Sequence, residues 1–503
     1  MDNLKNLISK ILKEVSYVTD TLEEAGFQAY LVGGCVRDLL MDIEPKDWDV
    51  TTNAKPDEII ALFEKTVYEN TFGTVGVYVS CETKDSVNHE TSKFLIIEVT
   101  PYRLEAQYND FRHPNEVKFS NNPEDDLKRR DFTINAMTYS KGHLTDMFGG
   151  IKDLENKTIR TVGNPDDRFS EDALRMLRAV RLSVELDFSI AHETSQSIQK
   201  NSVFIKKISQ ERIHDEFVKI IMSKNPSAGI VMLQKFGLIK NIIPELEEGI
   251  GCEQSGEHIY DVWNHLLHAL QHAANQNWSL EIRIAALFHD IGKPRSRRLA
   301  EGAGKKKYTF YGHEVIGARI AEKIMERLKF PKKEIDLVKK LVRNHMFFSD
   351  TELITLSAVR RIIAKVGVEN IWLLMKVREC DRVGMRKKEA SYRLRKYFAM
   401  IEEALRDPIS VGQLKINGGY MIEKLGISPG PRMGWILHAL LEEVLDAPEK
   451  NTVEHLSELV KSLNILGDAE LKALGERGKE KKEELEEEEV EKLHTKHGVR
   501  KNP

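Results

Sequence analysis

The chain has 503 residues, and its 79 acidic and 75 basic side chains leave a formal net charge of −4, so any nucleic-acid surface must be a local basic patch. Its four cysteines lie far apart without a Cys-x-x-Cys pair, which argues against a zinc ribbon or a disulfide scaffold. No apolar run approaches the ~18 residues of a membrane span. We expect a soluble, cytoplasmic protein of about three or four domains that does not contact a membrane.

Residues 1–150 are predicted to form a mixed α/β head. A helix near residues 3–26 leads into a strand, a Gly-Gly turn, a helix and a second strand, and two further strands follow at 75–81 and 93–100. Gly33 and Gly34 would let backbone N–H groups approach a nucleotide triphosphate where the helix begins.

Asp47 and Asp49 stand at alternate positions of the second predicted strand and would share one of its faces. Cations held by such carboxylates can activate an attacking hydroxyl and neutralise a leaving pyrophosphate. We therefore expect both residues to bind catalytic Mg²⁺, with Glu98 as a third carboxylate from a buried neighbouring strand. Chance occurrence of Asp-x-Asp, or a Glu98 that simply reaches solvent, is the alternative.

From residue 151 to about 220 the pattern predicts a helical neck. Asp172 and Arg175 stand three apart, on a helix that Ser170 would cap. The carboxylate can accept from the amino group of cytosine or adenine and the guanidinium can donate to the adjacent ring nitrogen, so C and A fit while G and U do not. An ordinary surface ion pair is the alternative.

A helical body is expected over residues 221–400, and it contains a second set of possible metal ligands in the order of an HD-type metal phosphohydrolase. One divalent transition metal or Mg²⁺ could bind between four of them, and a second if two more join. The ligands are His265, His289, Asp290 and Asp381 for the first metal and His313 and His345 for the second. A metal-bound hydroxide would attack phosphorus. Alternatively, the domain persists only as an RNA-binding body.

A basic segment with interleaved aromatics closes the body and suits a phosphate backbone with bases or sugars nearby. Its expected RNA-binding residues are Arg382, Arg386, Lys387, Lys388, Arg393 and Arg395, among Tyr392, Tyr397 and Phe398. A solvated helix face over core aromatics is the alternative. A helical, tRNA-binding region over 401–470 and a charged tail over 471–503, disordered or a solvated helix, complete the predicted α+β organisation.

Three stretches, 31–52, 129–137 and 171–179, resemble the class II tRNA nucleotidyltransferase/poly(A) polymerase family, most closely its CCA-adding members with an HD domain. The resemblance implies two-metal transfer of C and A from CTP and ATP to the 3′ end of tRNA, with release of pyrophosphate. It places Arg37 and Asp38 in the triphosphate pocket and Arg130 and Asp131 at the ribose. It also assigns Asn135, Glu171, Asp172, Arg175 and Arg178 to nucleotide binding.

The sequence leaves several functions open. Within nucleotide transfer, poly(A), CC-only and A-only addition compete with CCA addition, although residues 102–114 resemble the flexible loop that CC-only enzymes lack. A phosphohydrolase whose head senses nucleotide and a non-catalytic RNA-binding protein are two further hypotheses. Nothing in the sequence calls for an obligatory protein partner.

Overall fold

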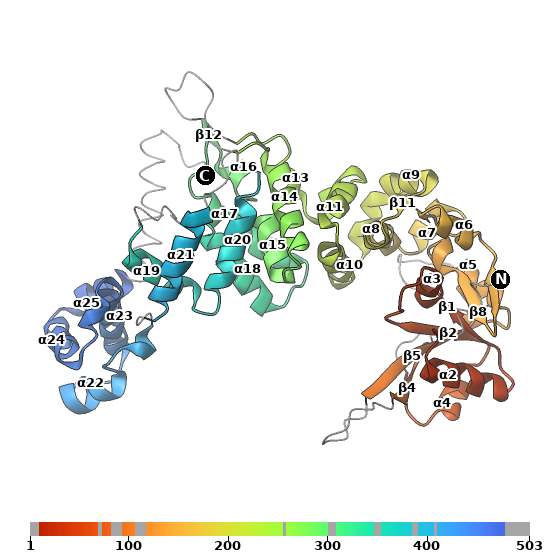
Figure 1. Ribbon diagram of the computed structural model, residues 1–503, viewed down its shortest axis with the longest axis horizontal. Helices are drawn as coiled ribbons and strands as arrows, with labels where there is room; N and C mark the ends of the chain where they lie inside the picture. Colours follow the sequence, from red (N-terminus) through yellow and green to blue (C-terminus); the bar gives the residue numbers. More distant parts are fainter. Residues whose placement is uncertain are drawn as a thin grey trace. The chain divides into compact units, whose positions relative to one another are not determined.

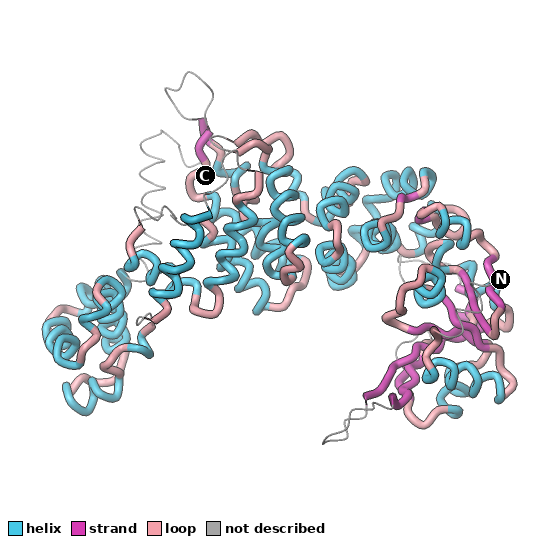
Figure 2. The backbone as a smooth tube through the Cα atoms, viewed as in Figure 1, coloured by secondary structure: helices cyan, strands magenta, loops and turns pink. Residues whose placement is uncertain are grey.

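The computed structural model describes nine segments of the chain, which form two compact units, residues 1–244 and 245–503 (Figure 1). The described segments are 10–68, 73–81, 93–105, 117–254, 258–299, 308–346, 354–384, 391–406 and 410–477. The predicted α+β class is confirmed, because a mixed sheet lies in the first unit and helices dominate the rest (Figure 2).

A seven-stranded sheet forms the head, in the order β3-β4-β5-β2-β1-β8-β9. Its β2–β5 pair is parallel, and its other neighbours are antiparallel. The strands are β1 (Ala29–Val32), β2 (Trp48–Thr52), β3 (Thr66–Tyr68), β4 (Val75–Cys81), β5 (Lys93–Pro101), β8 (Met137–Ser140) and β9 (His143–Asp146). A small separate ribbon pairs β6 (Arg103–Glu105) with β7 (Val117–Phe119).

Short helices cover and extend this sheet. Helix α2 (Lys13–Glu24) buries Val15, Val18 and Leu22 against it, and α4 (Pro56–Leu62) packs beside α2. A helix was expected near 3–26; the first described helix begins at Lys13, and residues 1–9 lie outside the described part. Helices α3 (Gly34–Leu40), α5 (Pro123–Lys128) and α6 (Gly150–Glu155) and the 3-10 turn η1 (Thr133–Asn135) complete the head.

The rest of the first unit is a helical neck. Its central helix α8 packs against α10 and α11. Leu177 and Val180 of α8 and Phe217 and Ile220 of α10 are all buried. The elements are α7 (Pro165–Glu171), α8 (Leu174–Leu186), α9 (His192–Asn201), η2 (Ser202–Lys207), α10 (Gln210–Met222), α11 (Pro226–Lys235) and α12 (Ile239–Ile242), with a two-stranded pair β10 (Thr158–Ile159) and β11 (Ser189–Ile190).

The second unit starts with a helical body. Its elements are α14 (Val262–Asn275), α15 (Leu280–Phe288), α16 (Lys293–Ser296), α17 (His313–Arg327), α18 (Lys332–Asn344), α19 (Leu356–Val366), α20 (Ile371–Asp381) and α21 (Ser391–Ala404), with the pair β12 (Arg298–Leu299) and β13 (Tyr308–Thr309). Helix α17 begins directly against Gly292, where a Cβ would lie 2.2 Å from the His313 carbonyl oxygen. Only glycine fits this contact.

Four helices close the described chain around their own apolar core, which includes Ile436, Leu440 and Leu456. They are α22 (Gly418–Leu425), α23 (Pro431–Asp446), α24 (Val453–Asn464) and α25 (Asp468–Arg477). Leu471, which the sequence analysis assigned to a solvated tail, is buried in this core; residues 478–503 lie outside the described part. Among the described helices, none has the length and apolar character of a membrane-spanning segment.

Candidate active sites

The head sheet brings two of the predicted carboxylates side by side. The parallel register of β2 and β5 pairs Asp49 with Glu98, and paired residues project from the same face of a sheet. Asp47 lies exposed just before β2. Burial raises the pKa of the Asp49 carboxyl, the Asp47 charge adds to this, and Arg130 opposes it. The three acids therefore form one concentration of negative charge.

Glu98 differs from expectation in its surroundings. Its neighbours Ile97 and Val99 are buried, whereas Glu98 itself is exposed on the other face of β5. The expectation of a strand buried around Glu98 is wrong, because only one face of β5 is covered here.

The Gly-Gly turn lies against these acids. Gly33 has φ +83°, and a Cβ there would lie 3.2 Å from an Asp49 carboxylate oxygen and 3.0 Å from Arg130 Nη1. Glycine is therefore required both by the backbone conformation and by the close approach. The turn opens α3 at Gly34, beside the carboxylates.

On α3, Arg37 connects two of the residues assigned to the nucleotide site. Its Nε and Nη2 donate to Asp38 Oδ1 at 2.9 and 2.7 Å, and its Nη1 donates to Asn135 Oδ1 at 2.8 Å. The structure therefore gathers Arg37, Asp38 and Asn135 into one hydrogen-bonded group.

Asp126, which the sequence analysis missed, supports Arg130. It is fully buried on α5 and accepts from Arg129 Nε at 2.9 Å and Arg130 Nη2 at 3.0 Å. Although burial opposes ionisation, Arg129 and Arg130 lower the pKa of the Asp126 carboxyl. The available signal was an acid three and four positions before an arginine pair, a spacing at which side chains meet on a helical turn.

Asp131 joins the head to the neck. Its Oδ2 accepts from Arg178 Nε of α8 at 2.7 Å, and its Oδ1 accepts from the Phe132 N–H at 2.8 Å. Burial opposes ionisation, but the charges of Arg178 and Arg175 hold the pKa of Asp131 at about 2. Asp131 is therefore an anion and a hydrogen-bond acceptor at neutral pH.

The predicted base template has a different local structure from the one expected. Asp172 does not share a helix with Arg175: α7 ends at Glu171, Asp172 is extended (φ −142°, ψ 103°), and α8 begins at Leu174. The Ser170 hydroxyl donates to the Asp167 carbonyl, so the expected Ser170 cap is wrong. The N-cap position of α8 is Ala173, and the preceding Asp172 accepts from the Leu174 N–H at 3.0 Å.

Asp172 and Arg175 are each held by other residues. Both oxygens of Asp172 accept from Arg212 of α10, at 2.6 and 3.2 Å. Arg175 donates to Glu171 Oε2 at 2.6 Å and to the Arg129 carbonyl at 2.9 Å. Their contacts among the described residues are therefore not those of a simple Asp172–Arg175 surface pair. Arg212 is a second residue that the sequence analysis missed.

The body gathers all six predicted metal ligands into two overlapping groups. His265, His289, Asp290 and Asp381 form one, Asp290 with His313 and His345 forms the other, and within each group the ligand atoms lie within 4.8 Å of one another. Asp290 Oδ2 is 3.4 Å from His265 Nε2 and 3.3 Å from His289 Nε2, and Asp290 Oδ1 is 3.2 Å from His313 Nε2. One oxygen of Asp290 therefore faces His265 and His289 of the first group, and the other faces His313 of the second group.

Backbone carbonyls orient three of these histidines. The Nδ1 atoms of His289, His313 and His345 lie 2.8, 2.6 and 2.6 Å from carbonyl oxygens three residues earlier. Donation from Nδ1 leaves Nε2 as the coordinating atom. Asp290 Oδ1 and the Nε2 atoms of His313 and His345 are buried without hydrogen-bond partners, which fits a cation-binding role.

The charges of the cluster also favour a bound cation. Burial opposes protonation, but Asp290 and Asp381 raise the pKa of His289 to about 10, so the cluster strongly favours added positive charge. Lys293, missed by the sequence analysis, lies 2.5 Å from Asp290 Oδ2 and donates to Gln254. The neighbouring ring of His258, also missed, stands edge-on to His265. The candidate cation ligands thus come from residues on, or directly after, helices α14, α15, α17, α18 and α20.

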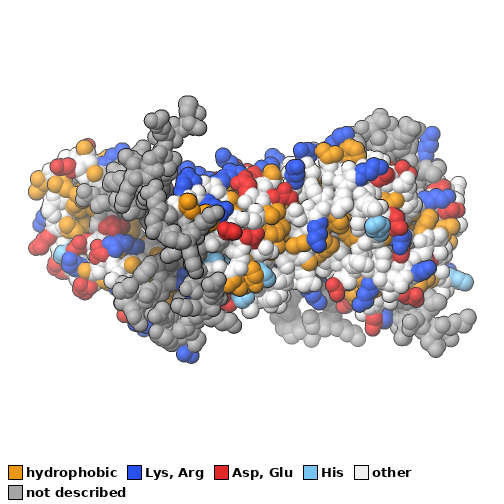
Figure 3. Space-filling view, turned by 90° about the horizontal axis from the view of Figure 1, so that it is seen from above, with side chains coloured by type: hydrophobic (Ala, Val, Ile, Leu, Met, Phe, Trp, Pro, Cys, Tyr) orange, Lys and Arg blue, Asp and Glu red, His pale blue; other side chains and the backbone are white. Residues whose placement is uncertain are grey.

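The predicted RNA-binding segment is described only in part. Arg382 is half-buried and Arg395 is exposed, whereas Arg386, Lys387, Lys388 and the side chain of Arg393 lie outside the described residues. Tyr397 is buried and Phe398 packs against Trp372, so the expectation that these aromatics are available for stacking is wrong for Tyr397. On the face drawn in Figure 3, basic and acidic side chains are intermixed.

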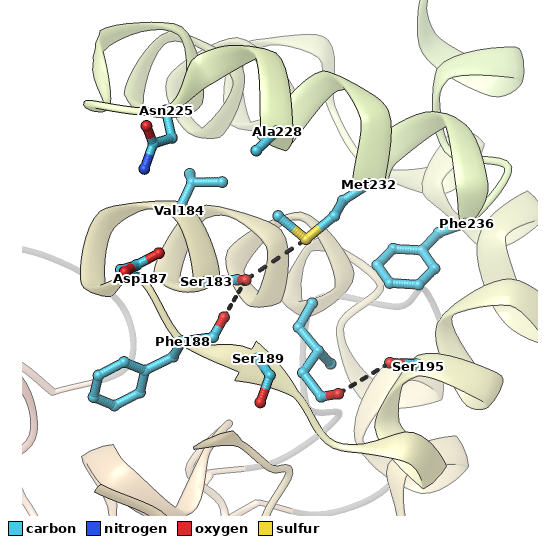
Figure 4. A pocket seen from close by; sticks show the side chains of 11 residues that line it. Ser183, Val184, Asp187, Phe188, Ser189, Ser195, Asn225, Ala228, Met232 and Phe236 are labelled. Atoms are coloured by element: carbon cyan, nitrogen blue, oxygen red, sulfur yellow. Dashed lines mark hydrogen bonds between the residues drawn. The ribbon is translucent and has the colours of Figure 1, made fainter. Parts of the chain in front are cut away.

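A pocket of about 430 Å³ lies in the neck, away from all predicted site residues. Ser183, Asp187 and Met232 line it, and the Ser183 hydroxyl donates to the Phe188 carbonyl (Figure 4). It contains no carboxylate pair or histidine cluster.

Comparison with known proteins identifies three domains. The chain carries the poly A polymerase head domain over residues 29–160, the probable RNA and SrmB-binding site of polymerase A over 187–250, and an HD domain over 262–386. The stretches 31–52 and 129–137 lie within the head-domain match, which confirms the resemblance drawn from them; the stretch 171–179 lies between the first two matches.

The individual proteins that the chain resembles include CCA-adding enzymes. The chain is 45% identical over 220 residues to the CCA-adding enzyme of Ligilactobacillus salivarius and 44% over 223 residues to that of Enterococcus faecalis, in each case 43% of this chain and 51% of the relative. The chain thus spans about half the length of the curated relatives it matches. The Bacillus stearothermophilus CCA-adding enzyme in complex with CTP is similar at 25% identity and TM-score 0.64, covering 90% of this chain and 97% of that one. The Thermotoga maritima enzyme complexed with tRNA, at 20% identity and TM-score 0.54, supports the fold alone.

The geometry of the histidine cluster predicts that Asp290→Asn releases metal. Because Asp290 contributes to both ligand groups, its loss should weaken binding by more than an outer-shell change, which typically costs about 10–100-fold. Elemental analysis of protein loaded with Mn²⁺ and then desalted measures this. The matched control is Asp336→Asn, the same carboxylate-to-amide change at an exposed position of α18. Full metal retention by Asp290→Asn would contradict the assignment.

Proposed function

We propose that this chain, which carries a poly A polymerase head domain and resembles CCA-adding enzymes, adds C and A from CTP and ATP to the 3′ end of tRNA. The observation that carries the proposal is the placement of Asp49 beside Glu98, with Asp47 adjacent and the Gly33 turn and Arg130 packed against Asp49. Carboxylates of this kind beside a glycine turn suit transfer of a nucleotidyl group.

Asp47 and Asp49 would hold Mg²⁺, with Glu98 as the third carboxylate. Bound Mg²⁺ supplies charge neutralisation at the transferring phosphate and activation of the attacking hydroxyl. Of the chain's own residues, Gly33 and Gly34 allow the triphosphate to approach the backbone, and Arg37 and Arg130 offer guanidinium groups to it. Asp131, held as an anion by Arg178, is an acceptor for a ribose hydroxyl.

Base choice falls to Asp172 and Arg175. Asp172 accepts from the exocyclic amino group of C or A, and Arg175 donates to the neighbouring ring nitrogen. G and U would instead direct a carbonyl oxygen at Asp172 and a ring N–H at Arg175, and each such mismatch costs about 1–3 kcal/mol. This arrangement fits the addition of both C and A; the loop over 102–114 that bears on CC-only addition lies largely outside the described residues.

The tRNA is the proposed partner. The RNA-binding domain match over 187–250 and the basic residues from Arg382 to Arg395 support this. Positive side chains along one segment suit contacts with a phosphate backbone.

A second activity is supported by a separate observation, the six buried ligands that overlap at Asp290. The HD domain would hold one or two divalent cations there, transition metals or Mg²⁺, and hydrolyse a phosphoester such as a 2′,3′-cyclic phosphate. The cations would supply an activated water, while the carbonyl-anchored histidines fix the geometry.

Asp49→Ala should reduce nucleotide addition by more than about 100-fold, because charge stabilisation by a bound cation is worth several kcal/mol. Extension of tRNA lacking its 3′ CCA by labelled CTP and ATP measures this. Asp57→Ala, an exposed change on α4, should behave as wild type. Near-normal addition by a folded Asp49→Ala protein would rule out the assignment.

Removing the template should relax base choice. In the Asp172→Ala/Arg175→Ala protein, UTP and GTP should gain roughly tenfold or more relative to CTP and ATP, since both discriminating groups are gone. Incorporation of the four nucleotides, each supplied alone, decides the matter. An unchanged preference for C and A would show that these residues are only structural.

The two centres should be separable by mutation. Asp290→Ala is expected to abolish hydrolysis of a 2′,3′-cyclic phosphate and to leave CTP and ATP incorporation within about twofold of wild type, because its carboxylate lies in the helical body, among the histidine cluster and Lys293. Both activities are measured on one preparation whose folding is checked by circular dichroism. Equal loss of both would refute the two-site proposal.

A further inference from the structure

The acceptor half of the base template is held by a residue from another helix. Asp172 lies two residues before the start of α8 and accepts from the Leu174 N–H, and its two oxygens face the guanidinium of Arg212, forty positions later on α10, at 2.6 and 3.2 Å. Both side chains are partly covered, with exposed fractions of 18% for Asp172 and 26% for Arg212. This two-bond pairing fixes the plane of the carboxylate as well as its position.

We propose that Arg212 is a positioning residue of the base template, which determines selection of C and A without contacting the base; the inference rests on the proposed function. A carboxylate offers about four acceptor directions. The Leu174 N–H and two guanidinium N–H groups use three of them. The remaining direction, on Oδ2, can accept one N–H, and an exocyclic amino group supplies it.

The donor half has anchors of its own. Arg175 is held by Glu171 at the end of α7 and by the Arg129 and Arg168 carbonyl oxygens. The Arg175 N–H donates to the Asp172 backbone carbonyl at 3.1 Å, but neither side chain is anchored by the other side chain. The spacing between donor and acceptor therefore depends on how α10, through Arg212, fixes Asp172 relative to α7 and α8.

A purely structural role predicts a different outcome, and α8 and α10 provide a matched control. Arg181 of α8 donates from Nε to Glu216 of α10 at 2.7 Å, and Glu216 is buried. Arg181→Ala therefore removes an arginine bridge between the same two helices without removing any contact of Asp172. A stability effect would be common to both variants, whereas an effect on base choice would be confined to position 212.

The experiment compares wild type, Arg212→Ala, Arg212→Lys and Arg181→Ala. Values of kcat and KM are measured for CTP, ATP, UTP and GTP on tRNA lacking its 3′ CCA, with Tm as the measure of stability. In Arg212→Ala we expect the ratio of kcat/KM for CTP over UTP to fall by about tenfold or more. Arg212→Lys keeps the positive charge but lacks the planar guanidinium, so its CTP/UTP ratio should lie between those of Arg212→Ala and wild type. Arg181→Ala should lower Tm and keep the wild-type ratio.

Two results would overturn the inference alone: a wild-type CTP/UTP ratio in Arg212→Ala, or an equal fall of the ratio in Arg212→Ala and Arg181→Ala. A wild-type chain that extends no tRNA would instead overturn the proposed function and this inference with it. The wild-type lane of the same assay therefore distinguishes the two failures.

Discussion

The parallel pairing of β2 with β5 sets Asp49 beside Glu98, and the proposed chemistry of the head depends on this register. A slip of one residue would turn Asp49 into the core face of the sheet. Val50, Ile97 and Val99 prevent the slip, because their burial on the covered face would be lost. Gly33 then completes the arrangement by bringing the β1–α3 turn within contact of the Asp49 carboxylate.

Three arginine–carboxylate pairs fix side chains in the head, between the head and the neck, and within the neck. Asp126 holds Arg130 behind Asp49, Asp131 holds Arg178 of α8, and Asp172 holds Arg212 of α10. Buried ion pairs contribute little net stability, because desolvation offsets their attraction, but their directional bonds fix side-chain positions. The first unit thus uses charge mainly to orient groups, and its apolar contacts between α8, α10 and α11 supply the stabilising burial.

The sequence predicted the features that depend on local pattern. Strands were expected at 75–81 and 93–100, where β4 and β5 form, and the adjacent His289 and Asp290 with partners on both sides indicated the histidine cluster that the structure assembles. Features that depend on tertiary contacts were missed or wrong. Arg212 contacts Asp172 only when α10 packs on α8, and Glu98 is exposed because one face of β5 is open. Ser170 cannot cap the helix of Arg175 because it lies inside α7, which runs from Pro165 to Glu171.

The central claim is that one carboxylate centre, with one donor–acceptor template, adds C and A in order to tRNA. It is tested most directly by incubating the wild-type chain with all four nucleotides and tRNA ending before its CCA, and sequencing the extended 3′ ends. The account predicts that the ends carry C, then C, then A, and that extension stops there. Homopolymeric A tails, incorporation of U or G at comparable frequency, or no extension at all would contradict it.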